Sequence, residues 1–502
     1  MKLNELIEFI KSKEFDDYLL KISSTREKEE NRYLSLIEEM KNYYNDNDDY
    51  YFVSSPGRIE ICGNHTDHQN GIVVACAINI DNVAIIKKTN DNICTFYDDN
   101  FYGKNNCIKV DISDLNMKDN EKNTSQSLIR GIASILHSKN KNIGGFFAIC
   151  DSHVLSGSGI SSSACFENMI VEIFNKLYND CSIDCKDRAN ISKKAENDFF
   201  GKPCGAMDQT AISFGSIIKI DFNPNTNEYI KQYNIDMSKL NYQLVLINTN
   251  SSHADLTDEY AAMPNEMRMV AKCFNKNNLI DVDENDFYNN LYDIRNNIKN
   301  DRAILRAIHF FDEMNRVRKL DNILDHLQTD NNYINDFLQI INESGNSSYK
   351  YLQNVYSNKN VNEQSLSIAI SLCEKLLKYE DGIDNQKSLQ ELNHCTGSAS
   401  VRPYDYKYKL SATTRAPQAF APTIINENEV APTTTDENAV ATTDYLVHPY
   451  GAVRVHGGGL SGTILCFVPS DKINSFSTNL TKIMKNFTIY TVDIRKVGTF
   501  SL

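Results

Sequence analysis

The sequence lacks any apolar stretch long enough to cross a bilayer, which argues against a membrane-embedded protein. It also lacks the uninterrupted apolar core of a signal peptide at its N-terminus, because acids and bases are spread through residues 1–22. We therefore expect a cytoplasmic protein with no membrane partner.

Paired Cys-x-x-Cys spacings and long runs of Lys or Arg are absent too. The 13 cysteines are scattered and odd in number, as in proteins whose thiols stay reduced; we interpret the closest pair, Cys181 and Cys185, as structural. The net charge is -14, whereas nucleic-acid binders need a concentrated basic face. We therefore expect small-molecule substrates and no nucleic-acid partner. The oligomeric state stays open, with a monomer favoured.

The chain, at 502 residues, exceeds what one hydrophobic core usually organises, so two domains are expected. Residues 1–50 are predicted to be a helical N-terminal segment, residues 51–250 a mixed α/β domain, and residues 251–396 with 450–502 a second α+β domain. The predicted strands include residues 51–55, 72–80, 83–88, 145–151, 216–221 and 243–249, and helical periodicity covers 162–178 and 186–199.

Residues 397–449 fit neither pattern. They are rich in Thr, Pro, Ala and Asn, and residues 421–430 are followed by a similar decamer at 431–440. Such short polar copies cannot build a packed core, so we interpret the segment as a mobile insertion.

A serine-rich loop, residues 156–165, follows a predicted strand and opens a helix. Its glycines allow the backbone to approach an anion closely, and its serines can cap the helix, whose free N–H groups and dipole favour phosphate. The Ser163 hydroxyl could also serve Mg²⁺. The alternative is an ordinary N-cap, and no lysine follows as it does in a Walker motif.

This loop resembles the second motif of the GHMP kinases, a superfamily of small-molecule kinases in which Gly-Leu-Gly-Ser-Ser-Ala wraps the phosphates of ATP. A serine, Ser161, stands at the third-position glycine, as in galactokinases. The ATP-binding residues that the resemblance implies are Gly157, Ser158, Gly159, Ile160, Ser161, Ser162 and Ser163.

Residues 55–68 are predicted to pack several hydrogen-bonding side chains into a turn between two hydrophobic runs. Recognition of a hexose needs such a density, because each hydroxyl both donates and accepts. The alternative is a solvated polar loop. The segment resembles the galactokinase signature Gly-Arg-x-Asn-x-x-Gly-Glu-His-x-Asp-Tyr. The residues in register are Arg58, Gly63, His65 and Asp67.

The same segment departs from the signature at Glu60, Asn64 and His68. The family glutamate contacts a sugar hydroxyl, and Asn64 replaces that carboxylate by an amide, which leaves the identity of the sugar open. The resemblance implies that Asn64, His65 and Asp67 bind the substrate.

Residues 195–209 place two acids near one turn, because a helix is predicted to end near Gly201 and a second element to begin at Pro203. Phosphoryl transfer needs Mg²⁺, an oxygen ligand for it, and a carboxylate beside the acceptor hydroxyl. Glu196 and Asp208 are the candidates, the alternative being solvated surface acids.

This segment resembles the one that bears the catalytic aspartate of galactokinases. The resemblance implies that Asp208 faces the anomeric hydroxyl with Gly205 nearby, and that Glu196, with Ser163, binds magnesium. Arg58 would then lie beside Asp208, keep it ionised and stabilise charge on the phosphoryl group. That would weaken Asp208 as a base, so full proton abstraction stays open.

Two further features match the family less closely. Tyr260 corresponds to a galactokinase tyrosine that touches the sugar, the alternative being a plain packed tyrosine. Residues 454–462 join two predicted strands through a run of glycines that permits very close approach. This run is either an ordinary hairpin turn or, by resemblance, the third GHMP motif, Thr-Gly-Gly-Gly-Phe-Gly-Gly, with departures at His456, Leu460 and Ser461.

The resemblance covers about residues 50–395 and 450–500. It implies an α+β fold of two domains, an N-terminal domain like domain 2 of ribosomal protein S5 and a ferredoxin-like C-terminal domain, with the active site in the cleft. The implied function is Mg²⁺- and ATP-dependent phosphorylation of D-galactose at its anomeric hydroxyl. The alternatives are a kinase for N-acetylgalactosamine, arabinose, galacturonate or a non-sugar alcohol, and a non-catalytic sensor of sugar and ATP.

Overall fold

The computed structural model describes residues 1–502 except 45, 99, 101–105, 155–158, 203, 252–256, 328, 331, 378–449 and 461. The described residues belong to one compact unit, Met1–Lys378 with Pro449–Leu502. The predicted insertion, residues 397–449, lies outside the described residues. The predicted division of the rest near residue 250 stays a prediction.

The larger sheet has eight strands in the order β12-β1-β2-β5-β3-β4, with β6 paired to β2 and β7 paired to β6. Neighbouring strands are antiparallel except β3 and β5, which are parallel. The strands are β1 Tyr50–Cys62, β2 Ile72–Lys88, β3 Ile93–Asp98, β4 Cys107–Asp111, β5 Phe146–Ser152, β6 Ile217–Asp221, β7 Ile230–Tyr233 and β12 Phe500–Ser501.

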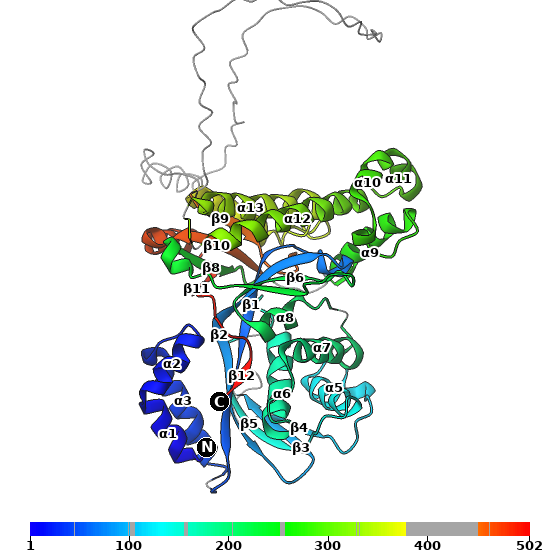
Figure 1. The fold of residues 1–502 in the computed structure, drawn as a ribbon. Helices are drawn as coiled ribbons and strands as arrows, with labels where there is room; N and C mark the ends of the chain where they lie inside the picture. The colour runs from blue at the N-terminus through cyan, green and yellow to red at the C-terminus, as the bar shows by residue number, and fades with distance from the viewer. Residues whose placement is uncertain are drawn as a thin grey trace, which may run out of the picture. The chain divides into compact units, whose positions relative to one another are not determined.

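Helices cover both faces of this sheet (Figure 1). Side chains of β2 alternate between the faces: Ala84 and Ile86 pack with α5, α6 and α7, whereas Val83 and Ile85 pack with α1, α2 and α3. The helices are α1 Leu3–Lys11, α2 Lys13–Lys21, α3 Arg26–Lys41, α5 Ser125–Ser138, α6 Ser162–Tyr178 and α7 Cys185–Ala195, which continues as the π-helical turn η3 Glu196–Phe200.

The smaller sheet is antiparallel, in the order β11-β8-β10-β9. One face packs against α14 and α16, and the other packs with α12 and α13. Its strands are β8 Tyr242–Asn248, β9 Ala452–Val455, β10 Thr463–Pro469 and β11 Thr488–Val492. The helices of this part are α9 Thr257–Cys273, α10 Glu284–Asn289, α11 Leu291–Ile298, α12 Asp301–His326, α13 Tyr333–Ser347, α14 Ser365–Leu377 and α16 Ile473–Ile483.

One hydrophobic core joins the two sheets. Ile59 and Val74 of the larger sheet are fully buried together with Leu244 and Leu465 of the smaller one. The short helix α8 Met207–Phe214 contributes Ile212 to the same core. This shared core fixes α8 against the end of β1, where the polar residues of the two segments meet.

The predicted strands at 72–80 and 83–88 are in fact one strand, β2. The first of the two polar residues between them, Asp81, does not break the strand because it is buried in ion pairs with two arginines. Its carboxylate oxygens lie 2.7 Å from Arg32 Nη1 and 2.8 Å from Arg495 Nη1. Paired in this way, a charge is tolerated inside a sheet.

The predicted turn at residues 55–68 is wrong in its first half. Strand β1 runs on to Cys62 and stays paired with β2, with register shifts at Pro56/Arg58 and at Glu60/Cys62. Ile59 and Ile61 supply the apolar face that keeps this stretch in the sheet. Arg58 and Glu60 are thereby held on a strand rather than on a loop.

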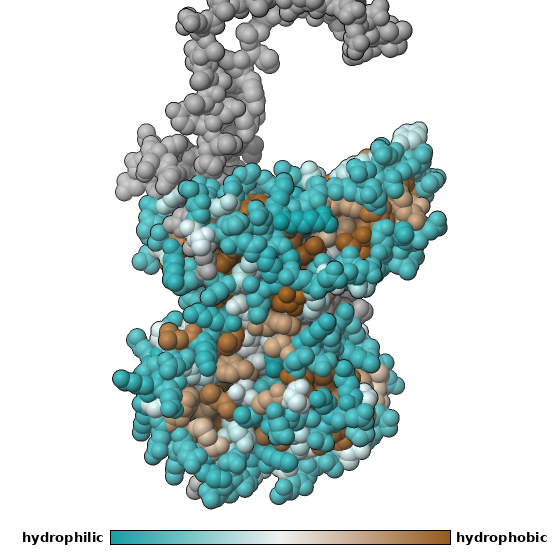
Figure 2. Space-filling model, viewed as in Figure 1, coloured by the Kyte–Doolittle hydropathy of each residue, from teal (hydrophilic) through white to brown (hydrophobic). Residues whose placement is uncertain are grey.

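The surface in Figure 2 is mainly hydrophilic on the face in view, as expected when most apolar side chains pack into the cores. Among the helices described, none is both long and apolar enough to cross a membrane. The cysteines that the structure describes are all free thiols.

Candidate active site

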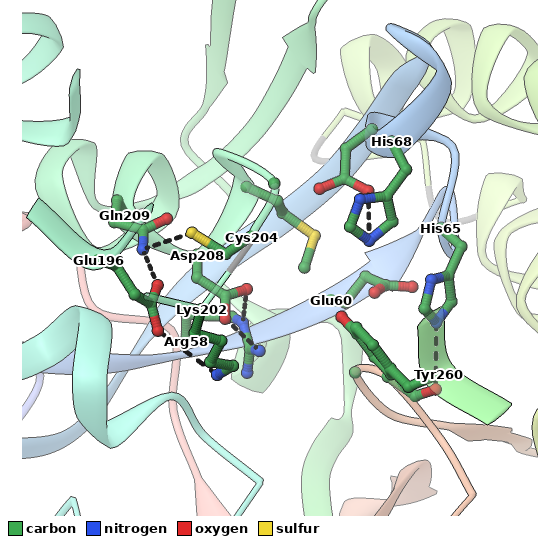
Figure 3. Close-up of a pocket in the computed structure, with 15 residues that line it drawn as sticks. Arg58, Glu60, His65, His68, Glu196, Lys202, Cys204, Asp208, Gln209 and Tyr260 are labelled. Atoms are coloured by element: carbon green, nitrogen blue, oxygen red, sulfur yellow. Dashed lines mark hydrogen bonds and ion pairs between the residues drawn. The ribbon is translucent and has the colours of Figure 1, made fainter. Parts of the chain in front are cut away.

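A polar pocket lies where the end of β1 meets α8, the loop before α8 and the glycine run after β9 (Figure 3). Arg58 and Glu60 reach it from β1, Asp208 from the first turn of α8, and Tyr260 from α9. Titratable groups far apart in the sequence are therefore gathered in one hollow, which is the usual arrangement of a substrate site.

Arg58 and Asp208 form a two-point ion pair at the floor of this pocket. Arg58 Nε donates to Asp208 Oδ1 at 2.6 Å, and Arg58 Nη2 donates to Oδ2 at 2.8 Å. The arginine side chain is 6% exposed and the aspartate side chain 31%, so the carboxylate still faces the pocket. The sequence predicts this proximity, and the structure has it.

The charge state of Asp208 follows from its neighbours. Burial by itself would raise its pKa, but the Arg58 guanidinium and the Ser161 hydroxyl, which donates to Oδ2, bring that pKa below its ordinary value. Ser161 lies at the N-cap of α6 with φ 64°, and its side chain makes no cap hydrogen bond. Ser161 therefore does not provide the helix cap that was expected from the serines of this loop, because its hydroxyl is bonded to Asp208 instead.

Glu196 lies at the other side of Asp208, in the π-helical turn, and is 2% exposed. Ser163 Oγ donates to its Oε1 at 3.1 Å, and Gln209 Nε2 donates to its Oε2 at 2.8 Å. Lys202 Nζ lies 3.4 Å from Oε1. The Ser163 hydroxyl on α6 and the Glu196 carboxylate on η3 are thus adjacent oxygen groups of the kind that bind hard metal ions.

Of the predicted substrate residues, His65, Asp67, Gly205 and Tyr260 all line the pocket. His65 Nε2 lies 3.1 Å from the carbonyl oxygen of Gly458, which can only accept, so this nitrogen carries the proton. Burial lowers the pKa of His65 to about 3, and the ring is neutral. Its Nδ1 has no hydrogen-bond partner within the described chain.

Asn64, the other predicted substrate residue, has a different position. It is fully buried and is absent from the pocket lining. Its Nδ2 donates to Glu60 Oε1 at 2.9 Å and to Gly457 O at 2.8 Å, while its Oδ1 accepts from Asn354 at 2.7 Å. Protein groups already occupy both ends of this amide, which is incompatible with direct contact to a substrate.

In the glycine run after β9, Gly458 packs closely against Tyr260 of α9. A Cβ on Gly458 would lie 2.5 Å from the Tyr260 ring. The ring of Tyr260 lies 5.3 Å from that of His65 and 6.2 Å from that of His68. Gly458 therefore lets Tyr260 settle against the histidines that line the pocket. The run also joins the antiparallel pair β9 and β10, so it is a strand connection as well.

Among the predicted ATP-binding residues, Gly159, Ile160, Ser161, Ser162 and Ser163 are described, whereas Gly157 and Ser158 lie outside the described residues. A second cavity begins at Ser162 and Ser163 and extends between Leu128, Phe166 and Phe200. Its volume is about 390 Å³, against about 80 Å³ for the polar pocket. Ser163, which lines this larger, partly apolar cavity, donates to Glu196, which lines the polar pocket.

Comparisons with known proteins agree with this geometry. Residues 39–88 match the galactokinase galactose-binding signature, and residues 127–216 match the GHMP kinases N terminal domain. A galactokinase from Clostridium tetani is 31% identical over 270 residues, which are 53% of this chain and 66%, just under two thirds, of that protein. A galactokinase from Clostridium acetobutylicum is 29% identical over 318 residues, 62% of this chain and 77% of that protein.

The chain is thus similar to galactokinases and, over residues 127–216, to GHMP kinases. Solved structures agree on the fold. Lactococcus lactis galactokinase, in complex with galactose, superposes with a TM-score of 0.68 at 20% identity, covering 93% of this chain and 99% of that one. Methanococcus jannaschii mevalonate kinase gives 0.52 at 12% identity, covering 89% and 98%. The predicted α+β GHMP kinase fold is confirmed.

The site of this galactokinase-like protein includes residues that the sequence analysis missed. Glu60, Lys202 and Gln209 line the pocket, and His456 touches it through Arg58, its Nε2 lying 3.3 Å from Arg58 Nη1. Glu60 and His456 were visible only as departures from family motifs. Gln209 follows Asp208 directly, and Lys202 lies six residues after Glu196, so proximity in sequence to a predicted site residue was their one available signal.

The donors at Ser163 and Glu196 fit a magnesium ion. Mg²⁺ prefers hard oxygen ligands and needs few of them from the protein, because substrate phosphates and water complete its shell. In the described part of the chain, no cluster of three or more His, Cys, Asp or Glu could hold a metal alone. A site shared between Ser163, Glu196 and a nucleotide is the arrangement that these residues allow.

Proposed function

We propose that this protein transfers the γ-phosphoryl group of ATP to the anomeric hydroxyl of D-galactose. The observation that carries the proposal is the Asp208 carboxylate, which lines the polar pocket and is held there by Arg58 and by Ser161, the residue directly before the Ser162 that lines the larger cavity. An acceptor in the pocket and a nucleotide in the cavity would meet at this carboxylate.

Asp208 orients the acceptor hydroxyl toward the phosphoryl group. Its lowered pKa keeps it ionised, so it accepts the hydroxyl proton as a hydrogen bond, and whether the proton transfers fully before the phosphoryl group arrives stays open. Arg58 offers its guanidinium to the same reaction centre, where it offsets the negative charge that develops on the transferring group.

The sugar is held by the polar wall of the pocket. Asp67 accepts from hydroxyl groups, the unpartnered Nδ1 of His65 is a further acceptor, and Tyr260, which packs against His65, presents its ring and hydroxyl. Gly205 leaves room for the Asp67 carboxylate. Several such groups at fixed positions can distinguish one monosaccharide from another by its hydroxyl stereochemistry.

ATP occupies the larger cavity, with its base near Leu128, Phe166 and Phe200 and its phosphates near Ser162 and Ser163. Ser163 and Glu196 would hold a magnesium ion together with the phosphates. Such an ion supplies positive charge that neutralises the phosphate oxygens during transfer. Location in the cytoplasm and a monomeric state are part of the proposal.

We expect replacement of Glu196 by Gln to weaken magnesium binding. An amide oxygen carries no charge, and loss of one charged ligand corresponds to an increase of about 10–100-fold in the Mg²⁺ concentration that half-saturates the enzyme. The measurement is Mn²⁺ or Mg²⁺ titration in the presence of a non-hydrolysable ATP analogue, together with activity.

Glu167→Gln is the matched control. Glu167 also accepts from Gln209, at 3.1 Å, but burial and the neighbouring Glu196 raise its pKa well above its ordinary value, which favours its neutral form. We expect this variant to keep the metal affinity of the wild type. Equal effects of the two substitutions would contradict the assigned role of Glu196.

We expect Gly205→Ala to weaken sugar binding selectively. The added Cβ would lie 1.7 Å from Asp67 Oδ2, so the carboxylate must leave its position. The sugar KM should rise by about 10–100-fold, the effect of losing a charged hydrogen bond, with the ATP KM nearly unchanged. Asp67→Ala should have a similar effect, and the two changes together should be far less than additive, since both act on one carboxylate.

The experiment that tests the function is ADP release from purified protein with galactose, N-acetylgalactosamine, arabinose, galacturonate or no sugar. We expect release with galactose, and product analysis should give galactose 1-phosphate. ADP release only with a sugar other than galactose would identify that sugar as the acceptor. Binding of ATP and sugar without any ADP release would favour the sensor that the sequence analysis left as an alternative.

A further inference from the structure

Glu60 occupies the pocket as a carboxylate that no predicted role accounts for. It lies two residues after Arg58 on β1, and the register of β1 against β2 is regular between these positions. Residues two apart on a strand point to the same face, about 6.6 Å apart along the chain. In Figure 3 the Glu60 carboxylate lies between His68 and Tyr260, on the far side of the pocket from Glu196.

The carboxylate of Glu60 is held rigidly but keeps bonding capacity. Its Oε1 accepts from Arg454 Nη2 at 2.6 Å and from Asn64 Nδ2 at 2.9 Å. Among the described residues, its Oε2 accepts only a longer bond from Asn64, at 3.2 Å. A carboxylate oxygen can accept two hydrogen bonds, so Oε2 has room for a hydroxyl donor that enters the pocket.

The surroundings of Glu60 show that its position is costly to maintain. Burial raises its pKa to about 7, against the opposing effects of Arg454 and Arg58. A buried carboxylate is retained where its charge has a use, or where it only balances a buried cation such as Arg454, which is 0% exposed. Glu60 is only 2% exposed, but it is among the residues that line the pocket, and this position favours the first case.

The pair Glu60 and Asn64 differs from the galactokinase signature in a way that the structure explains. Relative to the galactokinase signature, the amide and the carboxylate have exchanged positions, and here the two side chains are hydrogen-bonded to each other. Asn64 is fully engaged by protein groups, whereas Glu60 reaches the pocket.

We propose that Glu60 is a specificity-determining residue, whose carboxylate accepts a hydrogen bond from a non-anomeric hydroxyl of the sugar, and that Asn64 is the positioning residue that orients it. This inference rests on the proposed sugar kinase function. Because Arg58 holds Asp208 at the anomeric position, a group two residues along β1 faces a different part of the ring.

The test is a cycle of enzyme and substrate variants. Wild type and Glu60→Gln are compared on galactose and on the deoxygalactoses that lack, one at a time, each non-anomeric hydroxyl. We expect Glu60→Gln to lower kcat/KM for galactose by about 10–100-fold, with the ATP KM unchanged. For one deoxygalactose the two enzymes should differ by less than about 3-fold, because that sugar lacks the hydroxyl which Glu60 binds.

An equal loss for galactose and for every deoxygalactose would overturn the proposal, since a merely structural role cannot single out one hydroxyl. Glu172→Gln is the matched control: Glu172 is a buried carboxylate 2.8 Å from Arg188 Nη2, away from the pocket lining, and should leave the preference among sugars unchanged. If Glu60→Gln fails to fold, Glu60→Asp keeps the charge beside Arg454 and withdraws the carboxylate from the pocket. The same comparison on galactose and the deoxygalactoses then tests the role of Glu60.

Failure of the proposed function is recognised separately. A wild type that releases no ADP with any sugar contradicts the kinase proposal, and the same cycle run on sugar-binding affinity by calorimetry then decides the role of Glu60. A wild type that phosphorylates galactose, with no hydroxyl singled out by Glu60→Gln, overturns this inference alone.

Discussion

Asp208→Asn should fold normally and lose phosphoryl transfer by about 10²–10⁴-fold, the range found when a positioned acid-base group is removed. The asparagine keeps the size of the side chain and can still accept from Arg58 and Ser161. It carries no charge, so the acceptor hydroxyl loses its anionic partner. The measurement is kcat for galactose, with circular dichroism and thermal unfolding to establish the fold.

Asp198→Asn is the control for this prediction. Asp198 lies in the same π-helical turn as Glu196 but is exposed and absent from the pocket lining. Its variant should keep wild-type turnover. Near-normal turnover in Asp208→Asn, with the fold intact, would remove Asp208 from the reaction and leave the pocket as a binding site.

Arg58→Met should lower kcat by about 10²–10³-fold, the effect of removing one group that stabilises charge in a transition state. A second effect follows from the ion pair. Without the guanidinium, burial dominates and the pKa of Asp208 rises. Because the ionised form is the active one, activity on the acid side should be lost at a higher pH in the variant than in the wild type.

Two comparisons isolate this effect. Arg58→Met combined with Asp208→Asn should be little worse than either change alone, because both remove the same ion pair. Arg188→Met removes a similarly buried arginine, paired with Glu172, and should cost stability without moving the pH profile. An acid limb at the same pH in Arg58→Met and wild type would show that Arg58 does not control Asp208.

Local patterns were sufficient for much of the fold. The helix predicted at 162–178 coincides with α6, and the strand predicted at 145–151 lies within one residue of β5. Both segments have strong periodicity, bounded by glycine or by polar residues. The strand β1 was cut short in the prediction because Arg58 and Glu60 look like loop residues, and only pairing with β2 keeps them in the sheet.

The candidate site also contains some residues that local motifs predicted and others that only the structure shows. Arg58, Asp208, Glu196, His65 and Asp67 were recognisable because each stands in a short motif whose residue types match a chemical task. The partners that set their properties come from elsewhere in the chain: Ser161 for Asp208, and Gly458 for His65. No spacing in the sequence indicates these pairs.

The amino-acid sequence by itself indicated the similarity of this protein to galactokinases, most of its helices and strands, and most of the groups that line its polar pocket, because these depend on residue type and on neighbours within a few positions. Only the tertiary structure decided that Glu60 lines the pocket while Asn64 bonds to other protein groups, that Ser161 bonds to Asp208 rather than capping its own helix, and that Tyr260 packs on Gly458. These choices depend on burial and on hydrogen bonds between segments far apart in the chain, which local sequence does not encode.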